Sequence, residues 1–271
     1  MKIYEIINET EDISVGTLLY YEKNHDFIIE IRDTMDEWTA PMLLSAYVKR
    51  NVFTIPRDIS RLWVEERIVP SGRQNIDIIL RNHKIKAYDE MKLLEVAEGR
   101  CSQDDLAIKK LGELPEYVKD RMKTNVAECV VTEGKNILVF FADDTMRKID
   151  LSELSDLEGV DAVLKNDKLL DSCKVGTGGY FITFNDSIDI PSDVLYKAGT
   201  EMPLKLSDFM AFMRNNVLDT TESCSVLDCS RQNIAYMLRQ EQLSPLKEEV
   251  KGNLYLKGDV LKNTWGVLND Y

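Results

Sequence analysis

The stretch from residue 220 to residue 262 constrains the fold of this chain more than any other part. Small residues such as Ser223 stand where two helices would cross at close range, and Ser230 can cap a second helix that starts at Arg231. A short polar hairpin follows at residues 251–253. This order predicts a helix-turn-helix with a small wing.

The predicted second helix has two different faces. Ile234, Met237 and Leu238 fall on one arc at about 100° per residue and would pack against the first helix. The opposite arc and its flanks are polar. Gln can pair bidentately with adenine and Arg with guanine, while the flanking side chains suit phosphates. The candidate DNA-binding residues, including two from the hairpin, are Arg231, Gln232, Asn233, Tyr236, Arg239, Lys251 and Asn253.

The same segment resembles the excisionase-like winged helix-turn-helix family. Asp228 stands where the family has its turn glycine, which is tolerable because Asp enters the left-handed region more readily than most residues. The resemblance implies DNA binding, but such domains also dock proteins, so both roles stay open. The family pattern Thr-x-Glu-Ala-Ala-x-x-Leu-Gly-Val-Ser-Arg is matched at Thr220, Glu222, Leu227, Ser230 and Arg231.

The middle of the chain is strongly acidic. Residues 125–204 carry 15 Asp and Glu against 7 Lys and Arg, whereas the chain as a whole has a net charge of −13. Residues 205–271 are nearly neutral, with 9 acids against 8 bases, so we expect few phosphate contacts there and a dependence on dimerisation. The acids at predicted strand ends suggest a surface for a basic protein partner, and the alternative is that they only maintain solubility. These candidate partner-binding residues are Asp143, Asp144, Asp186 and Asp189.

The middle region also resembles the bacterial family called domain of unknown function 2442, a small sheet-rich α+β module. The family's characteristic Trp before the last turn is Phe184 here. The resemblance implies no established chemistry. It implies partners, since members are often encoded beside a small protein in an arrangement similar to toxin–antitoxin pairs. The matching residues are 138–144, 147–151, 180–186, 188–190 and 195–196.

The first 124 residues predict a small sheet joined to a cluster of helices. Alternating and β-branched residues indicate strands, and apolar residues at helical spacing indicate helices. In the middle region we expect a strand near 162–164, and a hairpin turn, not a phosphate loop, at the glycine-rich residues 176–179. The N-terminal strands are expected at 13–21 and 27–31, and the helices at 33–49, 73–83, 88–98, 103–111 and 116–123.

The tetrapeptide Arg-Gln-Asn-Ile occurs twice, at residues 73–76 and 231–234, and each copy is followed by three residues and then Leu-Arg. A duplicated DNA-contacting helix is one interpretation. However, Ile78 would lie on the outward arc of the first copy. We therefore expect the first copy to form a buried helix instead.

Signals for an enzyme are few. The two histidines, His25 and His83, are isolated, and the five cysteines form no CxxC pair, so we expect neither catalysis nor a metal or other cofactor. Reduced thiols and the lack of a signal peptide predict a cytoplasmic protein. No apolar run approaches the roughly 18–20 residues that cross a bilayer, so no membrane association is expected.

The fold class expected from these observations is α+β, with three modules. A small N-terminal sheet with a helical cluster occupies residues 1–124, an acidic sheet-rich α+β module residues 125–202, and a helix-turn-helix residues 203–271. The expected function is DNA-binding transcriptional regulation, with the first two modules sensing or binding a protein. An antitoxin-like role fits this layout. The alternative is a protein-interaction or inhibitor protein that uses its acidic surface and helix-turn-helix as docking surfaces.

Overall fold

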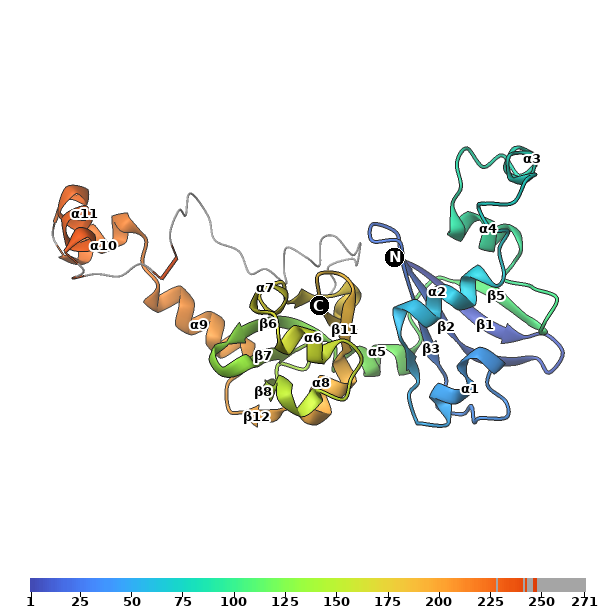
Figure 1. The fold of residues 1–271 in the computed structure, drawn as a ribbon, viewed down its shortest axis with the longest axis horizontal. Helices are drawn as coiled ribbons and strands as arrows, with labels where there is room; N and C mark the ends of the chain where they lie inside the picture. Colours follow the sequence, from blue (N-terminus) through green and yellow to red (C-terminus); the bar gives the residue numbers. More distant parts are fainter. Residues whose placement is uncertain (228, 241, 243–245, 248–271) are drawn as a thin grey trace.

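Helices and antiparallel sheets occupy separate stretches of the chain, which gives the α+β class predicted from the sequence (Figure 1). The computed structural model describes residues 1–227, 229–240, 242, 246 and 247. The first group of elements consists of β1 (Lys2–Asn8), β2 (Ile13–Tyr21), β3 (Asp26–Ile31), α1 (Met42–Val48), β4 (Thr54–Ile55), α2 (Arg57–Glu65), α3 (Ile76–Asn82), α4 (Glu90–Val96) and β5 (Leu106–Leu111).

The first sheet has five antiparallel strands in the order β4-β3-β2-β1-β5. The two expected strands at its centre are confirmed as β2 and β3. One face of the sheet packs against α1 and α2, where Leu44, Trp63 and Val64 are fully buried. Burial of these side chains together with those of the central strands supplies the hydrophobic stabilisation of this group.

The expected helix at 103–111 is wrong, because its residues form the edge strand β5. This strand pairs with β1 along its whole length, from Ile3 opposite Leu111 to Asn8 opposite Leu106. Leu106 and Ala107 are buried against the sheet. The unpaired edge of β1 offers a row of backbone donors and acceptors, and pairing with it outweighs local helix propensity.

The expected helix at 33–49 begins only at Met42. Asp36 accepts hydrogen bonds at 2.9 Å from the backbone N–H groups of Trp38 and Thr39, which makes a turn, and Pro41 precedes the helix. Trp38 and Met42 were among the apolar residues at helical spacing that indicated this helix, yet they are 85% and 93% exposed.

The middle group contains two small antiparallel sheets. Their strand orders are β12-β8-β7-β6 and β11-β10-β9. Residues 176–179 make the turn between β9 and β10, as predicted. The strand expected near 162–164 is wrong, because Val160 and Val163 lie on the buried side of a short helix. The elements are α5 (Glu116–Met122), β6 (Val126–Thr132), β7 (Asn136–Phe141), β8 (Met146–Asp150), α6 (Val160–Leu164), α7 (Asp167–Leu170), β9 (Lys174–Val175), β10 (Phe181–Phe184), β11 (Ile188–Pro191), α8 (Ser192–Ala198) and β12 (Thr200–Met202), with single 3-10 turns at Glu133–Lys135, Leu151–Leu154 and Thr177–Gly179.

The core of the middle group continues into the first sheet. Leu19 and Ile28 of that sheet belong to the same buried cluster as Val126, Phe141 and Phe184. The expected boundary after residue 124 falls between α5 and β6. The buried apolar cluster nevertheless contains residues from both sides of this boundary. The two groups therefore share hydrophobic stabilisation.

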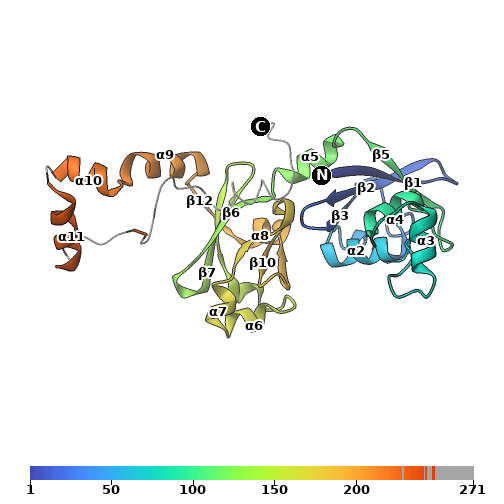
Figure 2. The same ribbon diagram turned by 90° about the horizontal axis from the view of Figure 1, so that it is seen from above.

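Three helices end the described chain: α9 (Leu206–Asn216), α10 (Thr220–Leu227) and α11 (Arg231–Arg239). The ring of Phe209 on α9 lies 5.7 Å from that of Phe140 on β7. Figures 1 and 2 show α10 and α11 beyond α9, at the end of the long axis opposite the first sheet. Across the described residues, none of the helices has the length and apolar character needed to cross a membrane.

Candidate functional sites

Specific side chains fix the start of each helix in the α10–α11 pair. The carboxylate of Asp219 accepts hydrogen bonds from the N–H groups of Thr221 (2.6 Å) and Glu222 (2.8 Å), and the Glu222 carboxylate accepts one from the N–H of Asp219 (2.9 Å). This reciprocal pattern is a capping box. Ser230 caps α11 as predicted, because its hydroxyl accepts from the N–H of Asn233.

The α11 helix buries one side and exposes the other. Ile234 is 6% exposed, whereas Tyr236 is 52% exposed. Leu238, expected on the buried arc, is 39% exposed. The guanidinium of Arg231 donates to the hydroxyl of Thr221 at 2.9 Å and so connects the two helices.

The remaining candidate DNA-binding residues of α11 are accessible. Gln232, Asn233 and Arg239 are all exposed. Arg239 also donates from Nε to the carbonyl of Ala235 at 3.2 Å, which leaves the far end of its guanidinium available. Lys251 and Asn253 lie outside the described residues.

The four candidate partner-binding acids lie in two separate places, the β7–β8 turn and the β10–β11 hairpin, and each has a partner within the chain. Asp143 accepts from the N–H of Thr145 at 2.9 Å and from the hydroxyl of Tyr196 at 2.8 Å. Asp144 accepts from the N–H and hydroxyl of Ser207, which fastens the start of α9 to the β7–β8 turn. These two carboxylates organise the chain locally.

The other two acids lie at the joint between the first and middle groups. The Nε of Arg57 is 2.6 Å from an oxygen of Asp189, and the Nζ of Lys174 is 2.8 Å from an oxygen of Asp186. Burial raises the pKa of Asp189, and Arg57 opposes this rise. A pocket of about 260 Å³ lies here, lined among others by Asn24, Asp26, Arg57, Lys174, Thr177 and Asp186. Its charged groups pair mainly with one another.

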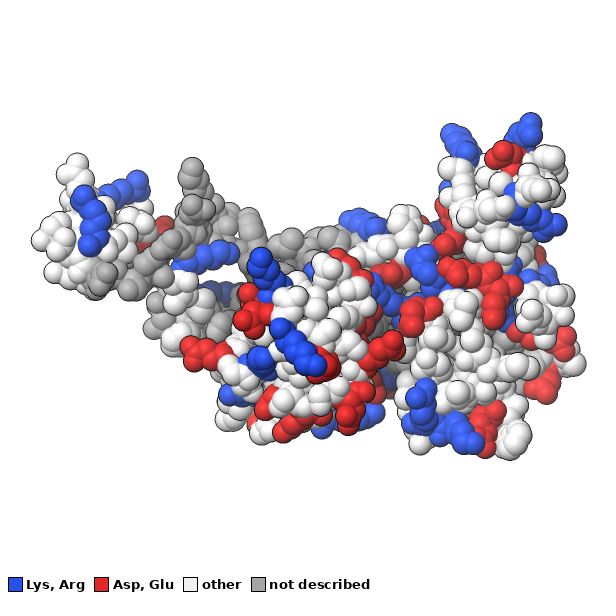
Figure 3. All heavy atoms as spheres, viewed as in Figure 1, with Lys and Arg blue, Asp and Glu red and all other residues white. Residues whose placement is uncertain are grey.

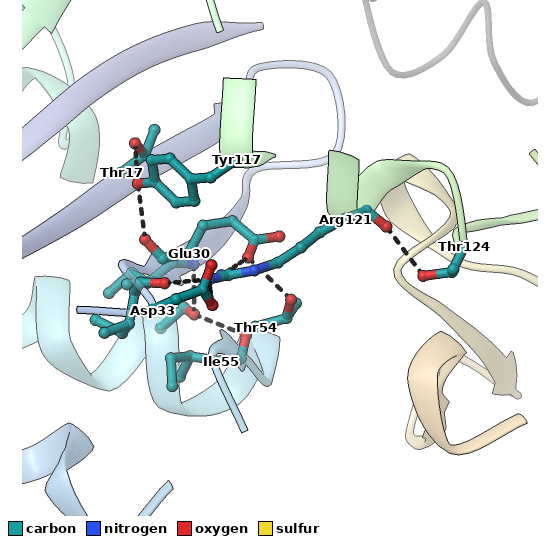
Figure 4. A network of polar contacts seen from close by, with 11 residues as sticks. Thr17, Glu30, Asp33, Thr54, Ile55, Tyr117, Arg121 and Thr124 are labelled. Carbon is teal, nitrogen blue, oxygen red and sulfur yellow. Dashed lines mark hydrogen bonds and ion pairs between the residues drawn. The ribbon is translucent and has the colours of Figure 1, made fainter. Parts of the chain in front are cut away.

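A buried carboxylate, Glu30 on β3, forms the centre of a polar network at this joint (Figure 4). One oxygen of Glu30 accepts from Arg121 of α5 at 2.7 Å and from Thr54 at 2.9 Å. Arg121 also binds Asp33 at 2.5 Å. Glu30 is fully buried, and this burial raises its pKa to about 7, although the charge of Arg121 opposes the rise.

Sequence reasoning missed this network, but one signal for it was present. Glu30 is the single carboxylate within the run 27–31 of β3, and all its other members, Phe27, Ile28, Ile29 and Ile31, are buried apolar residues. A charged residue inside such an apolar strand needs a partner from elsewhere in the fold. The identity of that partner, on a helix about ninety residues later in the chain, depends on the tertiary structure.

The two histidines lie apart. His25 is in the β2–β3 turn, where Nδ1 is 2.9 Å from the Tyr20 hydroxyl, and His83 follows α3. In the part of the chain that the structure describes, no three His, Cys, Asp or Glu side chains are grouped to hold a metal ion.

Comparison with protein-family models, curated proteins and solved structures found no match to this chain. The resemblances of the middle and C-terminal regions therefore rest on the residues quoted above.

Proposed function

We propose that this chain is a DNA-binding regulatory protein, and that α11 contacts the bases of a specific site. The observation that carries this proposal is the polarity of α11. Ile234 is buried, while Gln232, Tyr236 and Arg239 are exposed on the opposite side. Gln and Arg are the side chains that pair bidentately with adenine and guanine.

The capping of α10 and α11 supports the same proposal. A DNA-contacting helix must present its side chains in a fixed orientation, because discrimination between bases depends on hydrogen-bond geometry. Ser230 at the start of α11 and the contact of Arg231 with Thr221 both restrict the position of this helix relative to α10.

Substitution of Arg239 tests the proposal. After a cognate site has been selected from genomic DNA, Arg239→Ala should weaken binding to it by about 1–3 kcal/mol and reduce discrimination at one base position. Arg50→Ala is a matched control, because exposed Arg50 follows the end of α1 and also donates from Nε to a carbonyl four residues earlier. Selection that enriches no sequence would contradict the proposal.

Protein docking through the same helices is the second candidate function. Its supporting observation is apolar exposure, since Leu227, Tyr236 and Leu238 are 46%, 52% and 39% exposed on α10 and α11. Exposed apolar side chains are a feature of interaction surfaces. In this case Leu238→Ser would abolish capture of a protein partner, while no DNA sequence would be enriched in selection.

The proposal includes a protein partner with a basic surface and a homodimer that combines two α11 helices. Of the four candidate acids only Asp186 is exposed, and its side chain is 66% accessible. We place this regulator in the cytoplasm, with support from the five cysteines, which form no disulfide among the described residues. No catalytic role is included.

A further inference from the structure

A small protrusion at residues 70–88 has a charge opposite to that of the rest of the chain. It contains four Lys and Arg side chains and a single Asp, which is a net charge of +3 within a chain of net charge −13. Figure 3 shows these blue side chains gathered around α3, at the upper right of the view. The basic residues of the protrusion are Arg73, Arg81, Lys84 and Lys86.

The protrusion packs against α4 through a small buried cluster. Leu80 of α3 and Ile85 are buried together with Leu93 of α4. The hydroxyl of Tyr88 donates to the carbonyl of Val69 at 2.9 Å and joins the two ends of the segment. The four cations are therefore presented on an ordered support that projects from the first sheet (Figure 1).

All four cations are exposed, and among the described residues none of them forms an ion pair. Many other basic side chains of the first group are paired, as Arg57 and Arg61 are. Lys84 also has a left-handed backbone (φ 57°) where the chain leaves α3. Glycine is the usual residue in that conformation at a helix end, so a lysine there keeps a charge at the expense of local backbone preference.

The protrusion contains the same sequence pattern as α11, at residues 73–81 and 231–239. Both copies of Arg-Gln-Asn-Ile-x-x-x-Leu-Arg expose the first three residues and the final Arg, and Arg81 donates to the carbonyl of Asp77 as Arg239 does to that of Ala235. The expectation that the first copy is buried is wrong, since Ile78 is 52% exposed. However, α3 starts at Ile76, so its Arg-Gln-Asn precedes the helix and is not displayed on it.

We propose that residues 70–88 form a second DNA-binding surface, which contacts phosphates of the duplex backbone through Arg73, Arg81, Lys84 and Lys86. The inference rests on the proposed function because it takes DNA as the ligand. Backbone contacts follow from the chemistry: unpaired cations bind phosphates in any sequence, whereas base contacts need a helix seated in a groove. Since residues 205–271 are nearly neutral, the protrusion would supply the electrostatic affinity that α11 lacks.

The test is the salt dependence of binding to a duplex of arbitrary sequence. The triple variant Arg81→Gln, Lys84→Gln, Lys86→Gln should bind every sequence more weakly and lower the magnitude of the slope of log K against log salt by roughly 2–3, about 0.9 for each lost phosphate contact. The control is Lys109→Gln, Lys110→Gln, Lys148→Gln, which removes three exposed cations elsewhere and should keep the wild-type slope. Thermal unfolding of both variants is the check that they remain folded.

The outcomes separate this inference from the role proposed for α11. If the triple variant keeps the wild-type slope while Arg239→Ala loses sequence preference, the protrusion is not a DNA surface and α11 retains its role. If the slope falls while Arg239→Ala keeps full preference, the protrusion is supported and the role of α11 is lost. Unchanged DNA binding together with loss of an acidic protein partner would overturn the inference in favour of a protein contact.

Discussion

Glu30 lies in a place where charge is costly, since its side chain is fully buried among the apolar residues of β3. Arg121 provides the compensating charge, and its guanidinium also donates to the carbonyl of Ile31 at 2.6 Å. In such a site, desolvation favours the neutral carboxyl, and the ion pair only partly offsets it. Its protonation is therefore linked to folding.

The raised pKa of Glu30 makes the stability of the chain depend on pH. The folded chain holds a proton with a pKa of about 7, whereas the ordinary value in the unfolded chain is 4.5. Between these values the unfolded chain releases a proton that the folded chain keeps, so the free energy of unfolding falls as pH rises through this window. The fall is about 3 kcal/mol from this group and ends above pH 7.

Urea unfolding of Glu30→Gln across the same pH range measures this contribution. The variant stays uncharged, so its free energy of unfolding should lack this part of the decline. Asp33→Asn is the control, because Asp33 binds the same Arg121 but is 65% exposed. An equal decline in wild type and Glu30→Gln would exclude Glu30 as the source.

At the scale of elements, α10 depends on its capping box more than on its own apolar face. The helix has only eight residues, Thr220–Leu227, and Leu227 is 46% exposed. A helix this short is marginal in isolation, because the conformational entropy lost in forming its first turn is not offset by a few hydrogen bonds. Asp219 and Glu222 satisfy N–H groups at its start, and α11 packs against it.

Asp219→Ala should therefore loosen α10. Loss of an N-cap of this kind costs about 1 kcal/mol, which corresponds to roughly fivefold faster amide hydrogen exchange in residues 220–227. Affinity for the selected DNA site should fall with it, because α10 supports α11. Thr220→Ala, one residue further on and also exposed, should leave the exchange rates near wild type.

At the scale of the whole molecule, the first and middle groups behave as one packed body. Leu19 of β2 lies in the same buried cluster as Val139 of β7. The side-chain amide of Asn125 donates to the carbonyl of Gly178 at 2.9 Å, and a β-carbon at Gly178 would lie 2.5 Å from the Tyr21 hydroxyl. The glycine turn therefore fits closely against the first sheet.

This packing predicts cooperative unfolding of residues 1–202. Leu19→Ala leaves a cavity in the shared core and should lower the free energy of unfolding by about 2–5 kcal/mol. Hydrogen exchange should report the same loss in peptides from β2 and from β7. Leu227→Ala, exposed on α10, should change neither. A loss confined to β2 would mean that the two groups unfold independently.

Local sequence determined those elements whose signals are contained within a few residues. The two strands of the β2–β3 hairpin and the Ser230 cap of α11 were predicted, because alternation and capping side chains act over short distances. The α+β class follows from signals of the same kind.

Only the tertiary structure decided features that join distant residues. Residues 106–111 became a strand because β1 lacked a partner on that side, and Arg121 met Glu30 because α5 crosses the joint between the two groups. The basic protrusion likewise required the fold, since the sequence alone favoured burial of Ile78. Apart from proline, local propensities are worth at most about 1 kcal/mol per residue. Strand pairing, desolvation and core packing can each outweigh them, and these depend on which parts of the chain meet.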